Sequence, residues 1–175
     1  MLRLSFIFIL LITLLTYQNG YSAKSPDPVN IKLIVGSMDM KNRTINIGVE
    51  FRIQDGWHIY YKSPGDLGLP TVFQWQENIF KDVQIHWPQP IQHTDTTSNN
   101  IFHSNVYKDI VMFPISFALK HDNLNTKELS ISLRIKYAVC KDVCIPQEKV
   151  IILNRFLQDY VNQENLGLIN FWKKK

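Results

Sequence analysis

The sequence predicts an all-β protein built as an antiparallel β-sandwich, and two observations support that prediction. Apolar and polar residues alternate along most of the chain after residue 28, as they do in strands with one buried face. Turn-forming residues separate these stretches, and no helical pattern of about ten residues lies between them. Parallel α/β sheets need such helices, so the pattern favours a sandwich and disfavours a thioredoxin fold.

The first two strands are predicted over residues 29–35 and 45–53. Their alternating apolar positions are Val29, Ile31, Leu33 and Val35, then Ile45, Ile47, Val49, Phe51 and Ile53. A short polar run, Lys41–Arg43, connects the two stretches, and Asp55-Gly56 gives a turn signal after the second. Both stretches are therefore expected to be half-buried strands.

Later strands are predicted at 83–87, 110–117, 129–137 and 150–153, which makes at least six. The intervening stretches 62–70 and 88–105 are rich in turn-forming or polar residues and are predicted as long loops. A short helix is predicted near the C-terminus. Asn154 is its expected N-cap, and the segment carries Phe156, Leu157, Tyr160 and Val161 before Gly167.

Residues 1–23 have the pattern of a secretory signal peptide. Arg3 precedes the apolar run 4–15, and small residues follow at 20–23. The run is too short to cross a bilayer, so we expect cleavage near Ala23 and a single exported domain over residues 24–175. The formal net charge is only +4, and Lys173–Lys175 is the one basic block. A partner that is a nucleic acid is therefore not expected.

The two cysteines, Cys140 and Cys144, are separated by three residues between two predicted strands. A disulfide that closes so small a loop contributes only about 2 kcal/mol in the chain-entropy model. From spacing alone three interpretations stay open: a structural bridge in a noncatalytic binding domain, a redox-active pair, or a pair of thiolates for Cu(I) with His103 as a third ligand.

The remaining sequence offers little other chemistry. The five histidines form no close pair at metal-ligand spacing, and we expect each to be a surface or partly packed residue. Tyr60, Tyr61 and the tryptophans at 57, 75 and 87 are expected to be core or sandwich-edge aromatics. No nucleophile elbow or phosphate loop appears, so a hydrolase or kinase is not supported. We expect no cofactor and no resident metal.

Three segments resemble a known family. They are YAVCKDVCIPQE at 137–148, GWHIYYKSPGDLGLPTVFQW at 56–75 and VYKDIVMFPISF at 106–117. Together they resemble the N-terminal periplasmic domain of the thiol:disulfide interchange protein DsbD, and in particular its variant in the copper-tolerance protein ScsB. The resemblance implies an immunoglobulin-like sandwich in the periplasm. It also implies a protein-disulfide reductase-type electron relay between a membrane electron transporter and periplasmic thioredoxin-like proteins.

The resemblance also implies roles for individual residues. Cys140 and Cys144 match the redox pair, and Cys144 matches the cysteine that forms mixed disulfides with partners. Tyr137 matches the aromatic residue before the pair. Alignment on the step Tyr107 to Asp109 places the loop that caps the cysteines near Ile101 and Phe102. These two residues and Tyr137 are the expected shields of the pair. The shorter cysteine spacing is a departure from the best-known family pattern.

Overall fold

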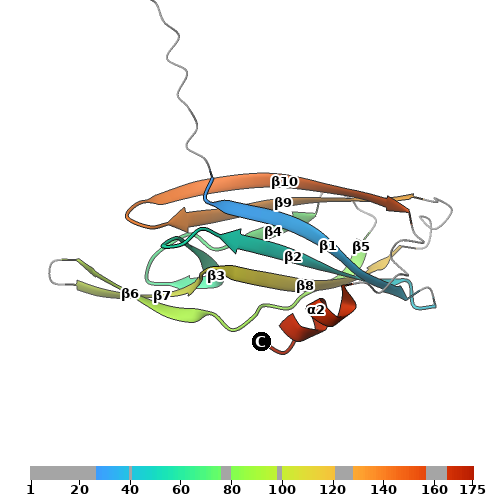
Figure 1. Cartoon of the computed structure of the whole chain (residues 1–175), viewed down its shortest axis with the longest axis horizontal. Coiled ribbons are helices and arrows are strands. Elements are labelled where there is room, and N and C mark those ends of the chain that lie inside the picture. Colours follow the sequence, from blue (N-terminus) through green and yellow to red (C-terminus); the bar gives the residue numbers. More distant parts are fainter. Residues whose placement is uncertain (1–26, 40, 76–79, 98–99, 121–127, 157–164) are drawn as a thin grey trace, which may run out of the picture.

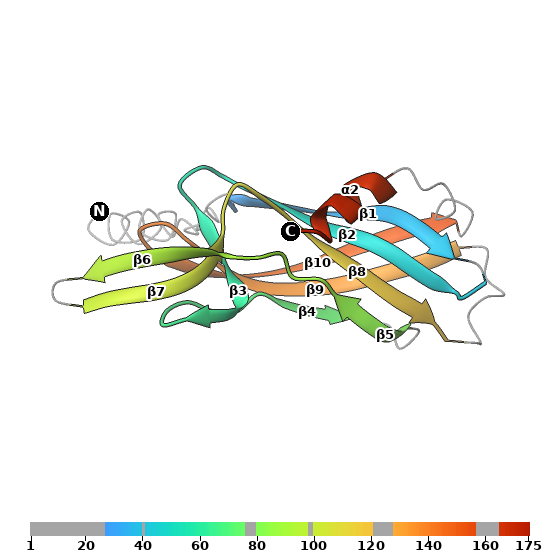
Figure 2. The same cartoon turned by 90° about the horizontal axis from the view of Figure 1, so that it is seen from below.

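The structure is a computed structural model that describes residues 27–39, 41–75, 80–97, 100–120, 128–156 and 165–175. Within this part of the chain lie ten strands and one helix. Every strand pairing is antiparallel, and the strands form two sheets that lie face to face (Figures 1 and 2). The predicted all-β fold, an immunoglobulin-like antiparallel sandwich, is therefore confirmed.

The first sheet has four strands and contains both strands predicted at the start of the chain. Its order is β1 (Val29–Asp39), β2 (Thr44–Ile53), β8 (Ile110–Leu119) and β5 (Phe80–Ile85). β1 and β2 form a hairpin whose register runs from Val29 opposite Ile53 to Asp39 opposite Thr44. This register turns the alternating apolar residues of both strands to the same buried face.

The second sheet has six strands and carries the cysteines. Its main path is β10 (Cys144–Phe156), β9 (Glu128–Cys140), β3 (His58–Gly65), β7 (Asn100–Tyr107) and β6 (Ile91–Thr97), and β4 (Val72–Trp75) also pairs with β9. β9 and β10 form a hairpin in unbroken register from Glu128 opposite Phe156 to Cys140 opposite Cys144. The two cysteines are therefore the last pair of a long ladder.

The core lies between the two sheets and is rich in aromatic side chains. The ring of Phe51 contacts those of Phe113 and Tyr137 edge to face, with centroids 5.3 and 5.9 Å apart. Aliphatic residues from β2 and β9, such as Ile47 and Leu133, are fully buried around them. Each such side chain contributes about 1.5–3 kcal/mol by leaving water. The core, more than the single disulfide, stabilises the fold.

The stretch 88–105, predicted as a loop, contains β6 and most of β7, which form a hairpin. Its residues pair from Ile91 opposite Val106 to Thr97 opposite Asn100. This hairpin projects past the β9–β10 turn at one end of the molecule (Figures 1 and 2). A projecting two-stranded ribbon has no fully buried face, so its sequence lacks the alternation on which strand prediction depends. The other predicted loop, 62–70, is likewise partly strand, because β3 continues to Gly65.

The predicted C-terminal helix exists, but the expected position was wrong. Asn154, the expected N-cap, lies in β10 opposite Ser130, because pairing with β9 extends that strand. The helix is α2 (Leu166–Trp172), and it includes Gly167. Its Ile169 is fully buried against the outer face of the four-stranded sheet, where glycines of β1 and β2 leave room. Residues 157, 160 and 161 of the expected helix lie outside the described residues.

Within the described ranges, no helix has the length and apolar character needed to cross a bilayer. The signal peptide predicted over residues 1–23 lies outside these ranges.

Candidate active site

The two cysteines meet at the turn between β9 and β10. Cys140 ends β9 and Cys144 begins β10, and their Cα atoms are 4.1 Å apart and joined through a disulfide. Residues 141–143 form the turn, in which the Lys141 amide donates a hydrogen bond to the Val143 carbonyl. The two cysteines are also register partners in the pairing of β9 with β10, which places them side by side.

The two sulfur-bearing residues differ sharply in exposure. Cys140 is only 2% exposed, whereas Cys144 is exposed to solvent. Cys140 packs on the outer face of the six-stranded sheet in a small cluster with Tyr60, Val106 and Ala138. A molecule that approaches from solvent therefore reaches Cys144 first.

Tyr60 and His58 of β3 lie beside the disulfide. The Tyr60 hydroxyl is 3.7 Å from the Cys144 Sγ and 3.4 Å from the His58 Nε2. His58 is also the register partner of Cys140, so its side chain lies on the same outer face of the sheet. His58 and Tyr60 are nearly fully buried, at 5% and 2% exposure respectively. One phenol thus lies beside the Cys144 sulfur, and one imidazole lies beside that phenol.

Both of these groups are neutral near pH 7, and burial moves the pKa of each further from that pH. Burial lowers the pKa of His58 to about 4, and the nearby charges of His93 and Lys108 act in the same direction, while Asp95 opposes them. Burial, with a smaller contribution from Asp95, raises the pKa of Tyr60. Tyr60 therefore contacts Cys144 as a neutral group, and His58 contacts Tyr60 as a neutral group.

The hairpin β6–β7 contacts this site through His93. The ring of His93 lies against that of His58, with centroids 4.7 Å apart. The His93 Nε2 also lies 3.3 Å from the Asp95 Oδ1. A short line of polar side chains thus runs from Asp95 through His93, His58 and Tyr60 to the exposed cysteine.

The loop that follows β3 covers Tyr60. Gly68 lies directly against the tyrosine ring, and the Thr71 hydroxyl donates a hydrogen bond of 2.6 Å to the Tyr60 carbonyl. Asp66 fixes the loop to β7 by accepting a hydrogen bond from the amide of His103. Beside this loop lies a hollow of about 310 Å³, lined by Leu69, Pro70, Lys136, Tyr137, Pro146, Gln147 and Glu148.

The residues expected to shield the cysteines lie in three different positions. Phe102 is half-buried and shares a face of β7 with Val106, the contact of Cys140, whereas Ile101 points to the opposite face and is 63% exposed. Tyr137 lies on the inner face of β9, among the core residues between the sheets. Because side chains alternate along a strand, its ring and the Cys140 side chain lie on opposite faces of β9.

In the described part of the chain, His103 and the two cysteines do not form a group arranged to hold a metal ion. Among the described residues, no group of three or more His, Cys, Asp or Glu side chains is arranged to hold a metal ion. His103, the candidate third copper ligand, pairs with Thr94 across the hairpin, and its Nδ1 lies 3.3 Å from the Thr94 hydroxyl. Alternation along β6 and β7 places it on the opposite face from His93.

Sequence reasoning missed His58, Tyr60 and His93 as site residues. The pattern of β3 contained a usable signal, because His58 and Tyr60 are two residues apart and so share one face of a strand. What the pattern lacked was the pairing of β3 with β9, which brings that face to Cys140. His93 was not identified as a site residue, because the stretch that contains it was predicted as a loop and is in fact part of the hairpin β6–β7.

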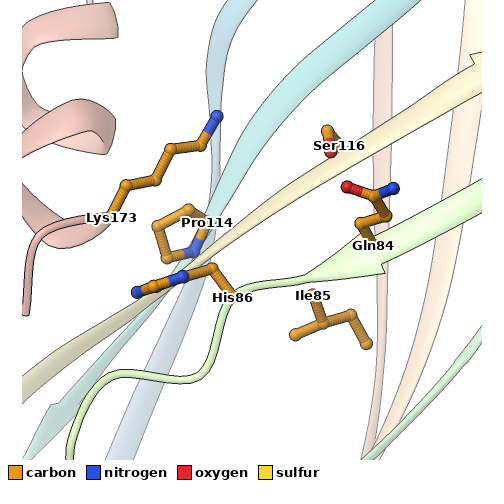
Figure 3. A pocket seen from close by; sticks show the side chains of 6 residues that line it. All are labelled: Gln84, Ile85, His86, Pro114, Ser116 and Lys173. Carbon is orange, nitrogen blue, oxygen red and sulfur yellow. The ribbon is translucent and has the colours of Figure 1, made fainter.

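A second hollow, of about 380 Å³, lies between β5, β8 and the residue that follows α2 (Figure 3). Its lining residues are Gln84, Ile85, His86, Pro114, Ser116 and Lys173. The His86 Nε2 is buried and has no hydrogen-bond partner among the described residues. No residue of the disulfide cluster lines this hollow, so it is not part of the candidate active site.

Comparisons with known proteins give matches to one family model and to solved structures. Residues 32–155 match the family model described as "Thiol:disulfide interchange protein DsbD, N-terminal". Among solved structures, the N-terminal periplasmic domain of ScsB from Proteus mirabilis is similar, with a TM-score of 0.67 and 21% sequence identity, over 85% of this chain and 54% of that one. This chain thus spans about half the length of the ScsB chain.

The reduced N-terminal domain of DsbD from Neisseria meningitidis also matches, with a TM-score of 0.44 and 15% identity, over 72% of this chain and 85% of that one. No curated protein sequence matches significantly.

Proposed function

Since the chain belongs to the family of N-terminal domains of the thiol:disulfide interchange protein DsbD, we propose that it relays reducing equivalents between a membrane electron transporter and thioredoxin-like proteins. Membership of the family supports thiol–disulfide exchange as its chemistry. The observation that carries the proposal for this chain is the exposure of Cys144 beside the buried Cys140. Such an arrangement gives incoming thiolates one sulfur to attack.

Reduction of the pair proceeds in two exchange steps. A donor thiolate attacks the Cys144 Sγ, which forms a mixed disulfide and releases Cys140 as a thiolate that takes a proton from water. The second thiolate of the donor then attacks the donor's first sulfur, which is part of the mixed disulfide. This step forms the disulfide of the donor and releases Cys144 as a thiolate. Two electrons have passed to the pair.

Delivery to an acceptor reverses these roles. The Cys144 thiolate attacks the disulfide of a thioredoxin-like partner, and one partner sulfur leaves as a thiolate. Cys140, after loss of its proton to water, attacks the Cys144 Sγ, restores the intramolecular disulfide and releases the second partner thiolate. Cys140 needs no access to the partner for this step, which agrees with its burial.

The fold tolerates both oxidation states. The hairpin register already fixes Cys140 opposite Cys144, and the core lies elsewhere, between the sheets. A disulfide across so short a loop restrains the unfolded chain little, so its loss costs only about 2 kcal/mol. This is what a bond that opens and closes in every catalytic cycle requires.

Shielding of the reduced pair is a further part of the proposal. Phe102 is the better of the two hairpin candidates, because it is half-buried on the face that carries Val106. Ile101 is exposed and so available to a docking partner. Replacing Phe102 with Ala should speed reaction of the reduced pair with a small disulfide, while Ile101→Ala serves as the matched change on the opposite face. Equal rates for both variants and the parent would remove Phe102 from the role.

We also propose that the protein works in the periplasm, exported by residues 1–23 and processed to a single domain over 24–175. The hollow lined by Leu69, Pro70 and Pro146, together with the charged residues Lys136 and Glu148, offers a partner a contact of mixed apolar and charged character beside β10. Maleimide labelling of Cys144 in intact cells, with and without outer-membrane permeabilisation, tests the compartment. Labelling that requires lysis of the inner membrane would contradict it.

The decisive experiment is the reduction potential of the Cys140 and Cys144 pair, measured against thiol buffers by mass after alkylation. We expect a value above about −250 mV, in the range of exchange-active disulfides. A value below about −300 mV would mark a structural bridge and favour the noncatalytic binding domain.

Partner trapping then tests the relay. A Cys140→Ala variant should accumulate mixed disulfides through Cys144, and the matched Cys144→Ala variant should not, because the remaining thiol is buried. Mass spectrometry of the trapped species identifies donor and acceptor. Equal trapping by the two variants would contradict the assignment of Cys144 as the attacked sulfur.

A further inference from the structure

We propose that Tyr60 is a catalytic residue that stabilises the Cys144 thiolate by donating a hydrogen bond to its sulfur, and that His58 is the positioning residue that makes Tyr60 a donor. The inference rests on the proposed exchange function and deepens it. It is carried by the two contacts of one hydroxyl, 3.7 Å to the Cys144 Sγ and 3.4 Å to the His58 Nε2.

The Tyr60 phenol has one proton to donate, and two neighbouring atoms can accept it, the His58 Nε2 and the Cys144 Sγ. When the His58 Nε2 carries a proton, it donates to the Tyr60 oxygen, and the Tyr60 proton is directed to Cys144. When the proton of the neutral ring lies on Nδ1, the Nε2 accepts from Tyr60, and the phenol oxygen is then free to accept from a Cys144 thiol. The tautomer of His58 is thus coupled to the protonation state of Cys144.

Neutrality of both groups is what makes this coupling work. His58 is 5% exposed and Tyr60 2% exposed, so neither is bathed in water that would compete for these hydrogen bonds. The charged or titratable groups that face them are His93 and Asp95 from β6 and Lys108 after β7. Burial lowers the pKa of His58 to about 4, which leaves the imidazole free to switch tautomer near pH 7.

The surroundings hold the phenol in place. Gly68 lies against one side of the Tyr60 ring, and Thr71 binds the Tyr60 carbonyl. His93 packs on the His58 ring from the hairpin. A fixed donor aimed at the sulfur stabilises the thiolate more than mobile water does, because its dipole needs no reorientation when the charge appears.

The benefit falls on two steps of exchange. Cys144 attacks a partner disulfide as a thiolate, and it leaves as a thiolate when the donor resolves the mixed disulfide. A hydrogen bond that favours the thiolate raises the fraction of reactive sulfur in the first case and improves the leaving group in the second. The proton lost by Cys144 passes to water in the first step, and no other reactant is needed.

The test is the pH profile of Cys144 alkylation by iodoacetamide in a Cys140→Ala background, which leaves Cys144 as the sole thiol. We expect Tyr60→Phe to slow alkylation at pH 7 by about tenfold and to move the midpoint of the profile to higher pH, since hydrogen bonds to charged acceptors are strong. Tyr61→Phe, the same change on the neighbouring residue, should leave the profile unchanged. A Tyr60→Phe profile that matches the Tyr61→Phe profile would overturn the assignment.

The role of His58 is tested in the same assay. His58→Phe should move the midpoint in the same direction by a smaller amount, and His58→Gln, whose amide still donates, should return it towards the parent. His103→Gln on the exposed face of the hairpin is the control. If His58→Phe and His58→Gln behave alike, the positioning role fails. Tyr60→Phe removes one oxygen and keeps the ring against Gly68, so that test does not depend on the folding of the His58 variants.

This assay does not require exchange activity. A low reduction potential with a shifted alkylation profile would reject the proposed function and keep the hydrogen bond. A high potential with an unshifted profile would keep the function and reject the roles of Tyr60 and His58.

Discussion

Gly68 lies so close to the ring of Tyr60 that no Cβ can be accommodated between them, and its φ of +94° is one that residues with side chains rarely adopt. The loop after β3 is therefore built around the tyrosine. Gly68→Ala should lower the free energy of unfolding by about 1–3 kcal/mol, through strain at this φ and displacement of the ring. It should also slow alkylation of Cys144 in the reduced protein, because the displaced phenol no longer faces the sulfur. Urea denaturation and alkylation rates measure the two effects.

Gly167→Ala is the matched control for that change. Gly167 lies in α2, and nothing surrounds the position of its missing Cβ. Alanine is the better helix former by about 0.5–1 kcal/mol, so this variant should be as stable as the parent or more so. If Gly68→Ala were equally harmless, the loop would not hold Tyr60 in the way the structure indicates.

The buried His58 makes stability depend on pH in the acid range. Its pKa is about 4 in the folded protein, against an ordinary value near 6.5, because burial disfavours the imidazolium and the positive charges of His93 and Lys108 add to this, while Asp95 opposes them. Below pH 6.5 the unfolded chain binds a proton that the folded chain does not. Stability should therefore be full above about pH 6.5 and fall as pH decreases towards 4, by at most about 1.4 kcal/mol per pH unit from this group.

Urea unfolding of the oxidised protein at several pH values between 4 and 7 tests this dependence. His58→Phe should flatten the slope in that window, whereas His103→Gln, on an exposed side chain, should leave it as in the parent. An unchanged slope in His58→Phe would mean that another group governs the acid response.

Alternation alone predicted the architecture because each sandwich strand buries one face. Val29 to Val35 and Ile45 to Ile53 contain that information within a few residues, and both stretches are strands, which the structure pairs in a hairpin. The hairpin β6–β7 was not predicted, because both of its faces are partly exposed to solvent and its apolar residues do not alternate regularly with polar ones. Local pattern was also misleading at Asn154, where thirteen residues of pairing with β9 outweigh any helical preference.

The site was only half predictable for a related reason. Cys140 and Cys144 are close in sequence, so their pairing is a local property. His58 and Tyr60 come to the sulfur through strand pairing and a contact with a residue 84 positions away, which no local pattern encodes. Tyr137, expected as a shield from the family resemblance, lies on the other face of the sheet, because it is three residues from Cys140 and side chains alternate along a strand.

Helix α2 should contribute to stability through one side chain. Ile169 is fully buried against Gly36 and Gly48, whereas its neighbour Leu168 is 42% exposed. Ile169→Ala should lower the free energy of unfolding by about 2–5 kcal/mol, because it leaves a cavity where the buried side chain was. Leu168→Ala should stay within about 0.5 kcal/mol of the parent. The reduction potential should be the same in both, because α2 packs on the sheet that lacks the cysteines, and a changed potential would show coupling between the sheets.

Tyr137 connects the start of the described chain to the cysteine-bearing hairpin. Its hydroxyl donates a hydrogen bond of 2.8 Å to Asp27, which also forms an ion pair of 2.7 Å with Lys149 of β10. Tyr137→Phe should lower the free energy of unfolding by about 1–3 kcal/mol at pH 7, since the lost hydrogen bond has a charged acceptor. Urea denaturation should detect this, with Tyr61→Phe, a half-buried neighbour of the core, as the control.

The same variant separates a structural role from a shielding role. Burial, with the hydrogen bond to Asp27, raises the pKa of Tyr137, so its contribution to stability should be present below about pH 10 and lost as pH rises further. Tyr137→Phe should weaken that alkaline loss. Its ring faces the core and not the sulfur, so the reaction of Cys144 with a small disulfide should keep the parent rate. A faster reaction with unchanged stability would instead make Tyr137 a shield of the cysteine pair.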